Sequence, residues 1–182
     1  MVEKIIGKIP LYNFLNMLQV GTVFCVFLVW FFEIPVVKNI TNLPEVGAGY
    51  FALLSIIPFV VVYEIGYIIF RLGGTVVEKI LKAKIKIKGK EYSLVYFDDE
   101  YGKFNDKRKD NPFLSVLSRE YAFARTQATL FVAIFSILIW FGEIGYAFIS
   151  LLLAIVFVWT ARKHSKNIVE IMYYKLSPQK AK

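Results

Sequence analysis

Long runs of hydrophobic residues dominate the chain, and polar residues gather between them. Residues 14–32, FLNMLQVGTVFCVFLVWFF, contain no charged side chain, and residues 50–70, YFALLSIIPFVVVYEIGYIIF, contain only Glu64. Each run is long enough to cross a hydrocarbon core of about 30 Å as an α-helix. The runs lack the strict alternation of barrel strands, so helices are the expected spanning elements.

A third apolar stretch, residues 121–161, is long enough for two spans. The segment FGEIG at 141–145 interrupts it with two glycines and a carboxylate, which predicts a tight turn between antiparallel helices. The chain is therefore predicted to be an all-α polytopic integral membrane protein with a four-transmembrane-helix bundle. The spans are expected at about 12–32, 50–71, 120–141 and 144–162.

The first span has one alternative, a cleaved secretory signal peptide. The run at 14–32 is long for such a segment, and no A-x-A-like cleavage site follows it. A retained spanning helix is therefore favoured.

The polar segment 72–118, between the second and third spans, is predicted to be a cytoplasmic loop insertion in a single membrane domain. Within it, AKIKIKGKEYSLVYF alternates Ile85 and Ile87 with lysines, passes through Gly89 and resumes the alternation at Tyr92, Leu94 and Tyr96. This period favours a small β-hairpin. A continued amphipathic helix is the alternative.

Composition and charge agree with a membrane location. The chain is 57% hydrophobic and 17% aromatic, with a mean hydropathy of +0.55. Its net charge of +8 is concentrated before the first span, in 71–119 and in a basic tail at 163–182, whereas 33–49 holds only Lys38 and the last turn only Glu143. The positive-inside rule then places both termini and the central loop on the cytoplasmic side of the cell membrane. Because topology accounts for the basicity, no specific nucleic acid binding is expected.

Two ionisable residues fall inside the predicted spans, where lipid makes charge costly. Glu64 lies about 9 Å of helix before Phe70, and Arg125 lies at a similar depth on the next span. We hypothesise that Glu64 and Arg125 form an intramembrane polar pair. The candidates to complete its hydrogen bonds are Tyr63, Tyr67, Tyr121 and Gln127. The alternative is that each side chain reaches the membrane interface independently.

A basic run follows the second span directly and is a candidate surface for anionic lipid headgroups or another anionic ligand. The residues assigned to this surface are Lys79, Lys82, Lys84, Lys86, Lys88 and, at the predicted entrance of the third span, Arg119. Topology together with attraction to lipid headgroups is the simpler account of these charges. Glu120, beside Arg119, suits a helix N-terminus by its charge.

No pattern of residues predicts a catalytic centre, a metal site or a cofactor. The acidic residues between Asp98 and Asp110 are interspersed with Lys103 and Lys107 and match no calcium-loop spacing, so they are interpreted as a solvated loop. Cys25 has no partner for a disulfide, and His164, the single histidine, has no neighbouring metal ligands.

The favoured function is therefore non-enzymatic and depends on helix association. We expect an oligomeric channel-like protein, or a membrane effector or scaffold within a larger complex, whose basic cytoplasmic face binds anionic lipid or ligand. Small residues offer positions for close helix contact: Gly21, Gly66, Gly142, Gly145, Ala128, Ala133 and Ala154. The alternative is a small membrane-embedded enzyme that acts on lipid through Glu64 and the rim formed by Arg119 and Arg125.

Overall fold

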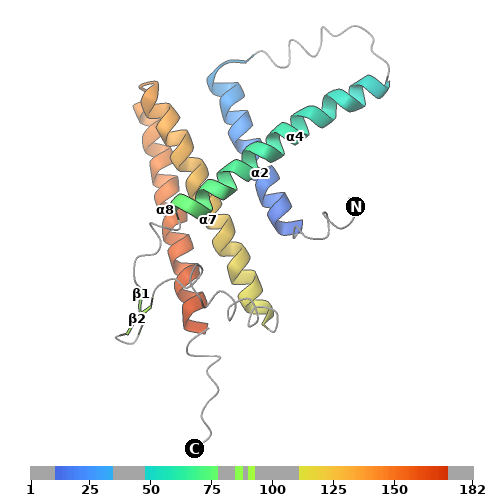
Figure 1. The fold of residues 1–182 in the computed structure, drawn as a ribbon. Helices are drawn as coiled ribbons and strands as arrows, with labels where there is room; N and C mark the ends of the chain where they lie inside the picture. The colour runs from blue at the N-terminus through green and yellow to red at the C-terminus, as the bar shows by residue number, and fades with distance from the viewer. Residues whose placement is uncertain (1–10, 35–47, 78–84, 88–89, 93–110, 172–182) are drawn as a thin grey trace, which may run out of the picture. The chain divides into compact units, whose positions relative to one another are not determined.

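The computed structural model describes residues 11–34, 48–77, 85–87, 90–92 and 111–171 of the 182-residue chain. Within these ranges four helices are long and apolar enough to cross a membrane, which confirms the predicted helical class. They are α2 (Leu11–Phe31), α4 (Ala48–Leu72), α7 (Pro112–Trp140) and α8 (Ile144–Glu170), shown in Figure 1. A short π-helical turn, η1 (Gly73–Val77), follows α4 directly.

Two short strands lie between η1 and α7. They are β1 (Ile85–Ile87) and β2 (Lys90–Tyr92), and they pair antiparallel with Ile85 opposite Tyr92. The other residues on which the predicted hairpin rests, Gly89, Leu94 and Tyr96, lie outside the described residues.

The chain divides into two compact units, residues 1–71 and residues 72–182. In the first unit α2 and α4 cross at a steep angle (Figure 1). Gly21 and Gly66 meet at this crossing, where a methyl group on Gly21 would overlap the carbonyl of Val62 and one on Gly66 would overlap the carbonyl of Met17. The two backbones are therefore in direct contact, as the small side chains at these positions allow.

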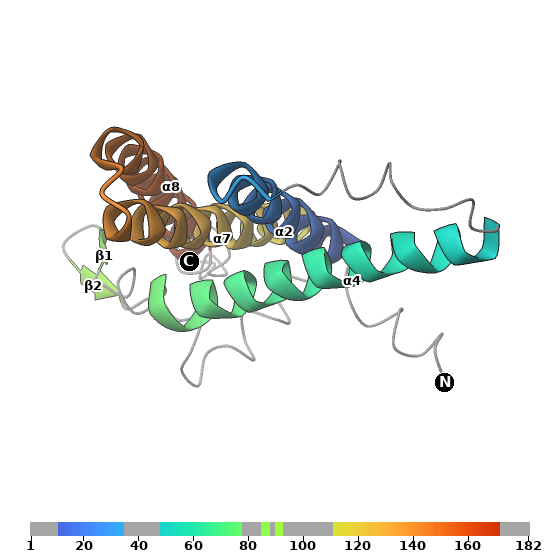
Figure 2. The same ribbon diagram turned by 90° about the horizontal axis from the view of Figure 1, so that it is seen from above.

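In the second unit α7 and α8 form an antiparallel hairpin, and they lie side by side in both Figure 1 and Figure 2. The turn between them is a Schellman motif: the N–H of Gly142 donates to the carbonyl of Ile139 at 3.1 Å and that of Glu143 to the carbonyl of Leu138 at 2.9 Å. Gly142 takes a φ of +81°, which a glycine adopts without strain. The tight turn predicted at 141–145 is thus present.

Small residues of α8 face α7 along the hairpin. The buried positions on α8 include Ala147, Ser150, Ala154, Ala161 and Ser165. The hydroxyl of Ser150 donates to the carbonyl of Phe131 on α7 at 2.8 Å, and the ring of Phe131 stacks on Phe157 with the centroids 5.7 Å apart. Side chains of this size let the two helices approach closely without relying on a hydrophobic effect, which lipid would not supply.

The described glycines at the turn have a different role from the one predicted for close helix contact. A methyl group on Gly142 or Gly145 would have no neighbour within 4 Å, so neither residue marks a close approach among the described residues. Gly142 serves the backbone turn instead. Gly21, Gly66, Ala128 and Ala154 do occupy buried positions.

Both helices of the hairpin extend beyond their predicted spans at the end away from the turn. The helix α7 begins at Pro112, eight residues before 120, and α8 ends at Glu170, eight residues after 162. Asn111 caps α7 by accepting hydrogen bonds from the N–H groups of Phe113 and Leu114 at 3.0 and 3.4 Å. Each extension adds about 12 Å of helix.

The main hydrophobic core of the second unit lies at this extended end. It includes Val77 of η1, Leu114, Leu117 and Tyr121 of α7, Ile168 and Val169 of α8, and Ile171 directly after α8. Leu114, Tyr121 and Ile168 are at most 2% exposed. The core therefore joins three elements that are distant in the sequence, and it fixes η1 against the hairpin.

Candidate functional site

Arg125 packs against the turn that follows α4. A methyl group on Gly73 would lie 3.6 Å from Cγ of Arg125 and 2.9 Å from Oγ1 of Thr129, whose hydroxyl donates to the carbonyl of Arg125 at 3.0 Å. The absence of a side chain at Gly73 thus leaves the space that Arg125 and Thr129 of α7 occupy.

The guanidinium group of Arg125 lies flat over Gly74. The position of a Cβ on Gly74 is 3.9 Å from each of the Cζ, Nη1 and Nη2 atoms, and three equal distances require that the planar group face the glycine. The Cζ atom also lies 5.8 Å from the centroid of the Tyr121 ring. This arrangement keeps the cation beside a backbone turn and an aromatic ring.

Glu64 and Arg125 belong to different compact units, so the hypothesis that they pair stays a prediction. Glu64 is exposed on α4. Of the side chains proposed to complete the pair, Tyr67 accepts a hydrogen bond from Nε of Arg71 at 2.8 Å, and the ring of Tyr63 lies 5.3 Å from that of Phe14. Tyr121 is the proposed partner that contacts Arg125 within one unit.

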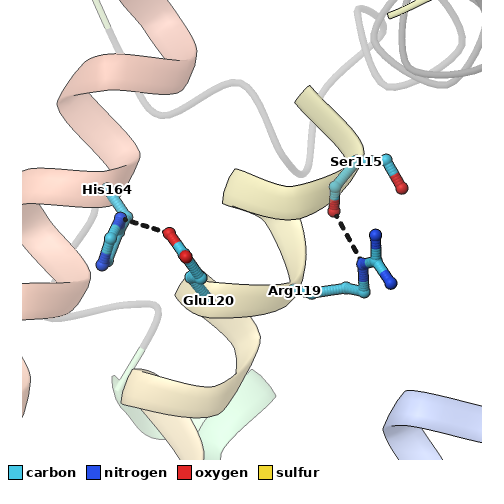
Figure 3. Close-up of polar contacts among 4 residues, drawn as sticks. All are labelled: Ser115, Arg119, Glu120 and His164. Atoms are coloured by element: carbon cyan, nitrogen blue, oxygen red, sulfur yellow. Dashed lines mark hydrogen bonds and ion pairs between the residues drawn. The ribbon is translucent and has the colours of Figure 1, made fainter. Parts of the chain in front are cut away.

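His164 and Glu120 join α8 to α7 at the extended end of the hairpin (Figure 3). Nδ1 of His164 lies 3.3 Å from Oε2 of Glu120, and the two side chains are 21% and 49% exposed. The distance is that of an ion pair, although the alignment does not meet the geometry of a hydrogen bond. The contact is therefore an ion pair only when the imidazole of His164 is protonated.

The sequence predicts Arg119 and Glu120 at the entrance of a helix, and the structure shows that this is wrong. The helix α7 begins seven residues before Arg119, so both residues lie in its third turn and Glu120 is too far from the N-terminus to act as a capping charge. Nε of Arg119 donates to the carbonyl of Ser115 at 3.3 Å, on a different side of α7 from His164 (Figure 3).

The basic run assigned to anionic ligands falls mostly outside the described residues. This applies to Lys79, Lys82, Lys84 and Lys88, and Lys86 is described only through the backbone of β1. The acidic residues of 98–110 also lie outside the described residues. A role for this run in binding stays a prediction.

Buried amide groups on α2 and α7 carry a cost that the described contacts do not offset. Asn16 is 3% exposed and Gln127 is 5% exposed. Neither amide atom of Asn16, nor Nε2 of Gln127, has a hydrogen-bond partner among the described residues. Such groups are expensive to bury in a low dielectric, so Asn16 and Gln127 are positions to test by substitution.

No protein-family model, curated protein or solved structure matches this chain.

Sequence reasoning missed two of these contacts, and a signal existed for each. Glu120 and His164 each lie 22 residues from Gly142, and residues equidistant from the turn of an antiparallel hairpin face one another. The pair Gly73-Gly74, placed directly after a span, marks a point of close backbone approach, but the sequence does not say which helix fills the space.

Proposed function

We propose that this chain is a multi-pass membrane protein without enzymatic activity that acts through helix association. The observation that carries the proposal is the large apolar surface that the described helices leave uncovered. Trp140 is 85% exposed, Ile144 73% and Ile57 61%. Trp140 is the last residue of α7, Ile144 is the first of α8, and Ile57 lies in α4. A surface of this kind requires lipid or other protein to cover it.

The uneven packing of the helices supports association as the mode of action. The hairpin α7–α8 is packed along its length, whereas α2 and α4 meet at one crossing around Gly21 and Gly66. Exposed apolar residues of α2 and α4, such as Leu11 and Ile57, offer contacts to helices of other copies or of another membrane protein. An oligomeric channel-like protein and a scaffold or effector both use such surfaces.

The cell membrane is the proposed location, with both termini and the basic central segment on the cytoplasmic side. The distribution of Lys and Arg along the sequence supports this orientation. Because Cys25 is the single cysteine, Cys25→Ser gives a background without thiols in which single cysteines report sidedness. In intact cells, Lys38→Cys should react with an impermeant maleimide, and Lys182→Cys should react only after the membrane is opened. The reverse pattern would overturn the orientation.

Mass and ion flux test the mode of action. The protein, in native lipid nanodiscs, is expected to have a mass above that of one chain, and a strictly monomeric mass would contradict the oligomer. Ion flux in proteoliposomes would support a channel-like protein. Absence of flux from a correctly assembled oligomer would instead favour the scaffold or effector.

A lipid-acting enzyme is the second candidate, because Glu64 is exposed on its helix and could reach a ligand. Incubation of the purified protein with a lipid extract should yield no product if the protein is not an enzyme. Product that disappears in Glu64→Gln and in Arg125→Gln would establish the alternative.

The pairing of Glu64 with Arg125 is tested by the folded yield of the two single variants and of the double variant. Strictly additive losses of yield exclude a direct contact.

A further inference from the structure

One exposed face of α8 changes in character along the helix, from apolar through aromatic to basic. Phe148, Leu152 and Ile155 come first and are 60%, 47% and 55% exposed, and Trp159 follows at 67%. The exposed residues Arg162, Lys163 and Lys166 complete the face. At 100° per residue all of these positions fall within one side of the helix, opposite the buried Ala154, Ala161 and Ser165.

The spacing along this face fits the hydrocarbon core of a bilayer, about 30 Å thick, followed by one headgroup layer. Ile144 and Trp159 are separated by about 22 Å of helix, and Lys166 lies about 10 Å beyond Trp159. Tryptophan is favoured at the level where hydrocarbon gives way to headgroups, and Lys or Arg just beyond it lies among the phosphates. The pattern therefore places the basic residues at the depth of phospholipid phosphates.

The cations of this face are available for an anionic partner. Among the described residues, Arg162 and Lys163 have no carboxylate partner, and Lys166 lies 3.9 Å from Oε1 of Glu170 in an exposed pair of the kind that contributes little. His164, between them in sequence, points to the opposite side of the helix and contacts Glu120 of α7. The three cations thus face outward together.

We propose that Trp159, Arg162, Lys163 and Lys166 form a binding surface for the headgroup of an anionic phospholipid. The inference rests on the proposed membrane location and adds to it a specific site and lipid class. The indole ring lies beside the glycerol region, and the three cations hold the phosphate and the additional charge of the headgroup. Zwitterionic lipid satisfies the apolar part of the face but not its charge.

Quenching of a single tryptophan by brominated lipid tests the site. The variant Trp30→Phe/Trp140→Phe leaves Trp159 as the only tryptophan of the full chain. Reconstituted into mixed vesicles, it should be quenched more strongly by brominated phosphatidylglycerol than by brominated phosphatidylcholine. The expected preference is at least about fivefold in relative binding constant, the order that one cation near a headgroup supplies.

Two triple variants separate the site from net charge. Arg162→Gln/Lys163→Gln/Lys166→Gln should abolish the preference, whereas Lys175→Gln/Lys180→Gln/Lys182→Gln removes the same charge elsewhere and should retain it. If the first variant does not fold, the protein with Arg162, Lys163 and Lys166 intact is measured at high NaCl instead. Screening by the salt should then reduce the preference for phosphatidylglycerol. A preference that survives the first variant or the salt, or that both variants lose equally, would overturn the site.

The same measurement distinguishes failure of the site from failure of the proposed function. Equal quenching by the two lipids would overturn the anionic site while leaving the chain in the bilayer. Absence of quenching by either lipid would overturn the membrane location itself, and the lipid site with it.

Discussion

Nδ1 of His164 and Oε2 of Glu120 lie 3.3 Å apart and join α8 to α7 beside the main hydrophobic core of the second unit. Tyr121 follows Glu120 directly and is 2% exposed, and Ser165 follows His164 and is fully buried. The contact therefore joins the two helices next to their main hydrophobic core.

Replacing Glu120 by glutamine should destabilise the hairpin, and the loss should be smaller when His164 is also replaced by glutamine. The two side chains lie 3.3 Å apart, so each substitution removes the same contact. Because Glu120 is 49% exposed, solvent screening limits the contribution to about 1 kcal/mol or less. Thermal unfolding of Glu120→Gln, His164→Gln and the double variant in detergent, compared with the unsubstituted protein, measures the coupling.

Glu170→Gln is the matched control for this effect. Its carboxylate faces Lys166 and not His164, so its effect on stability should add to that of His164→Gln. Strictly additive losses for Glu120→Gln and His164→Gln would show that the contact between them contributes nothing.

The sequence was sufficient for the helices but not for their contacts. Apolar runs and the FGEIG turn depend on local composition, so the four helices and the hairpin turn were predictable. The extensions of α7 and α8 were not, because a span is recognised by its hydrophobicity and the extension from Pro112 to Arg119 mixes Leu114 and Leu117 with polar residues. The contact of Arg125 with Gly74 depends on how η1 packs on α7, which no local pattern encodes.

Alanine at Gly21 or Gly66 should separate α2 from α4. The added methyl group would overlap a backbone carbonyl, which cannot rotate away as a side chain can, so we expect a loss of about 1–3 kcal/mol. Thermal unfolding of each variant in the same detergent measures this loss. Gly145→Ala is the control, because its methyl group meets no atom within 4 Å and alanine favours a helix, so its stability should stay equal or rise. Gly21→Ala as stable as Gly145→Ala would contradict the crossing.

Replacing Gly142 after α7 by alanine should lower stability, whereas replacing Glu33 after α2 by glycine should raise it. Gly142 has a φ of +81°, and alanine there should cost about 1–2 kcal/mol. Glu33 takes a φ of +50° in the same type of cap, with the N–H of Ile34 donating to the carbonyl of Val29 at 3.1 Å. Glu33→Gly should therefore stabilise α2 by up to about 1 kcal/mol in thermal unfolding. A loss at Glu33→Gly as large as that at Gly142→Ala would exclude backbone strain as the cause.

Alanine at Gly73 should be destabilising only while Thr129 keeps its hydroxyl. The added methyl group would lie 2.9 Å from Oγ1 of Thr129, which is held by its hydrogen bond to the carbonyl of Arg125. The variant Thr129→Ala lacks the hydroxyl that the methyl group would meet. Only the preference of alanine for helical backbone then remains, so Gly73→Ala should be neutral or stabilising in this background. The expected coupling in a double-mutant cycle of unfolding free energies is about 1 kcal/mol. Gly74→Ala, whose methyl group would make an ordinary 3.9 Å contact with the guanidinium of Arg125, should be tolerated in both backgrounds. Strictly additive effects of Gly73→Ala and Thr129→Ala would show that η1 does not pack on α7 at this point, and Arg125 would then lose the turn that positions it.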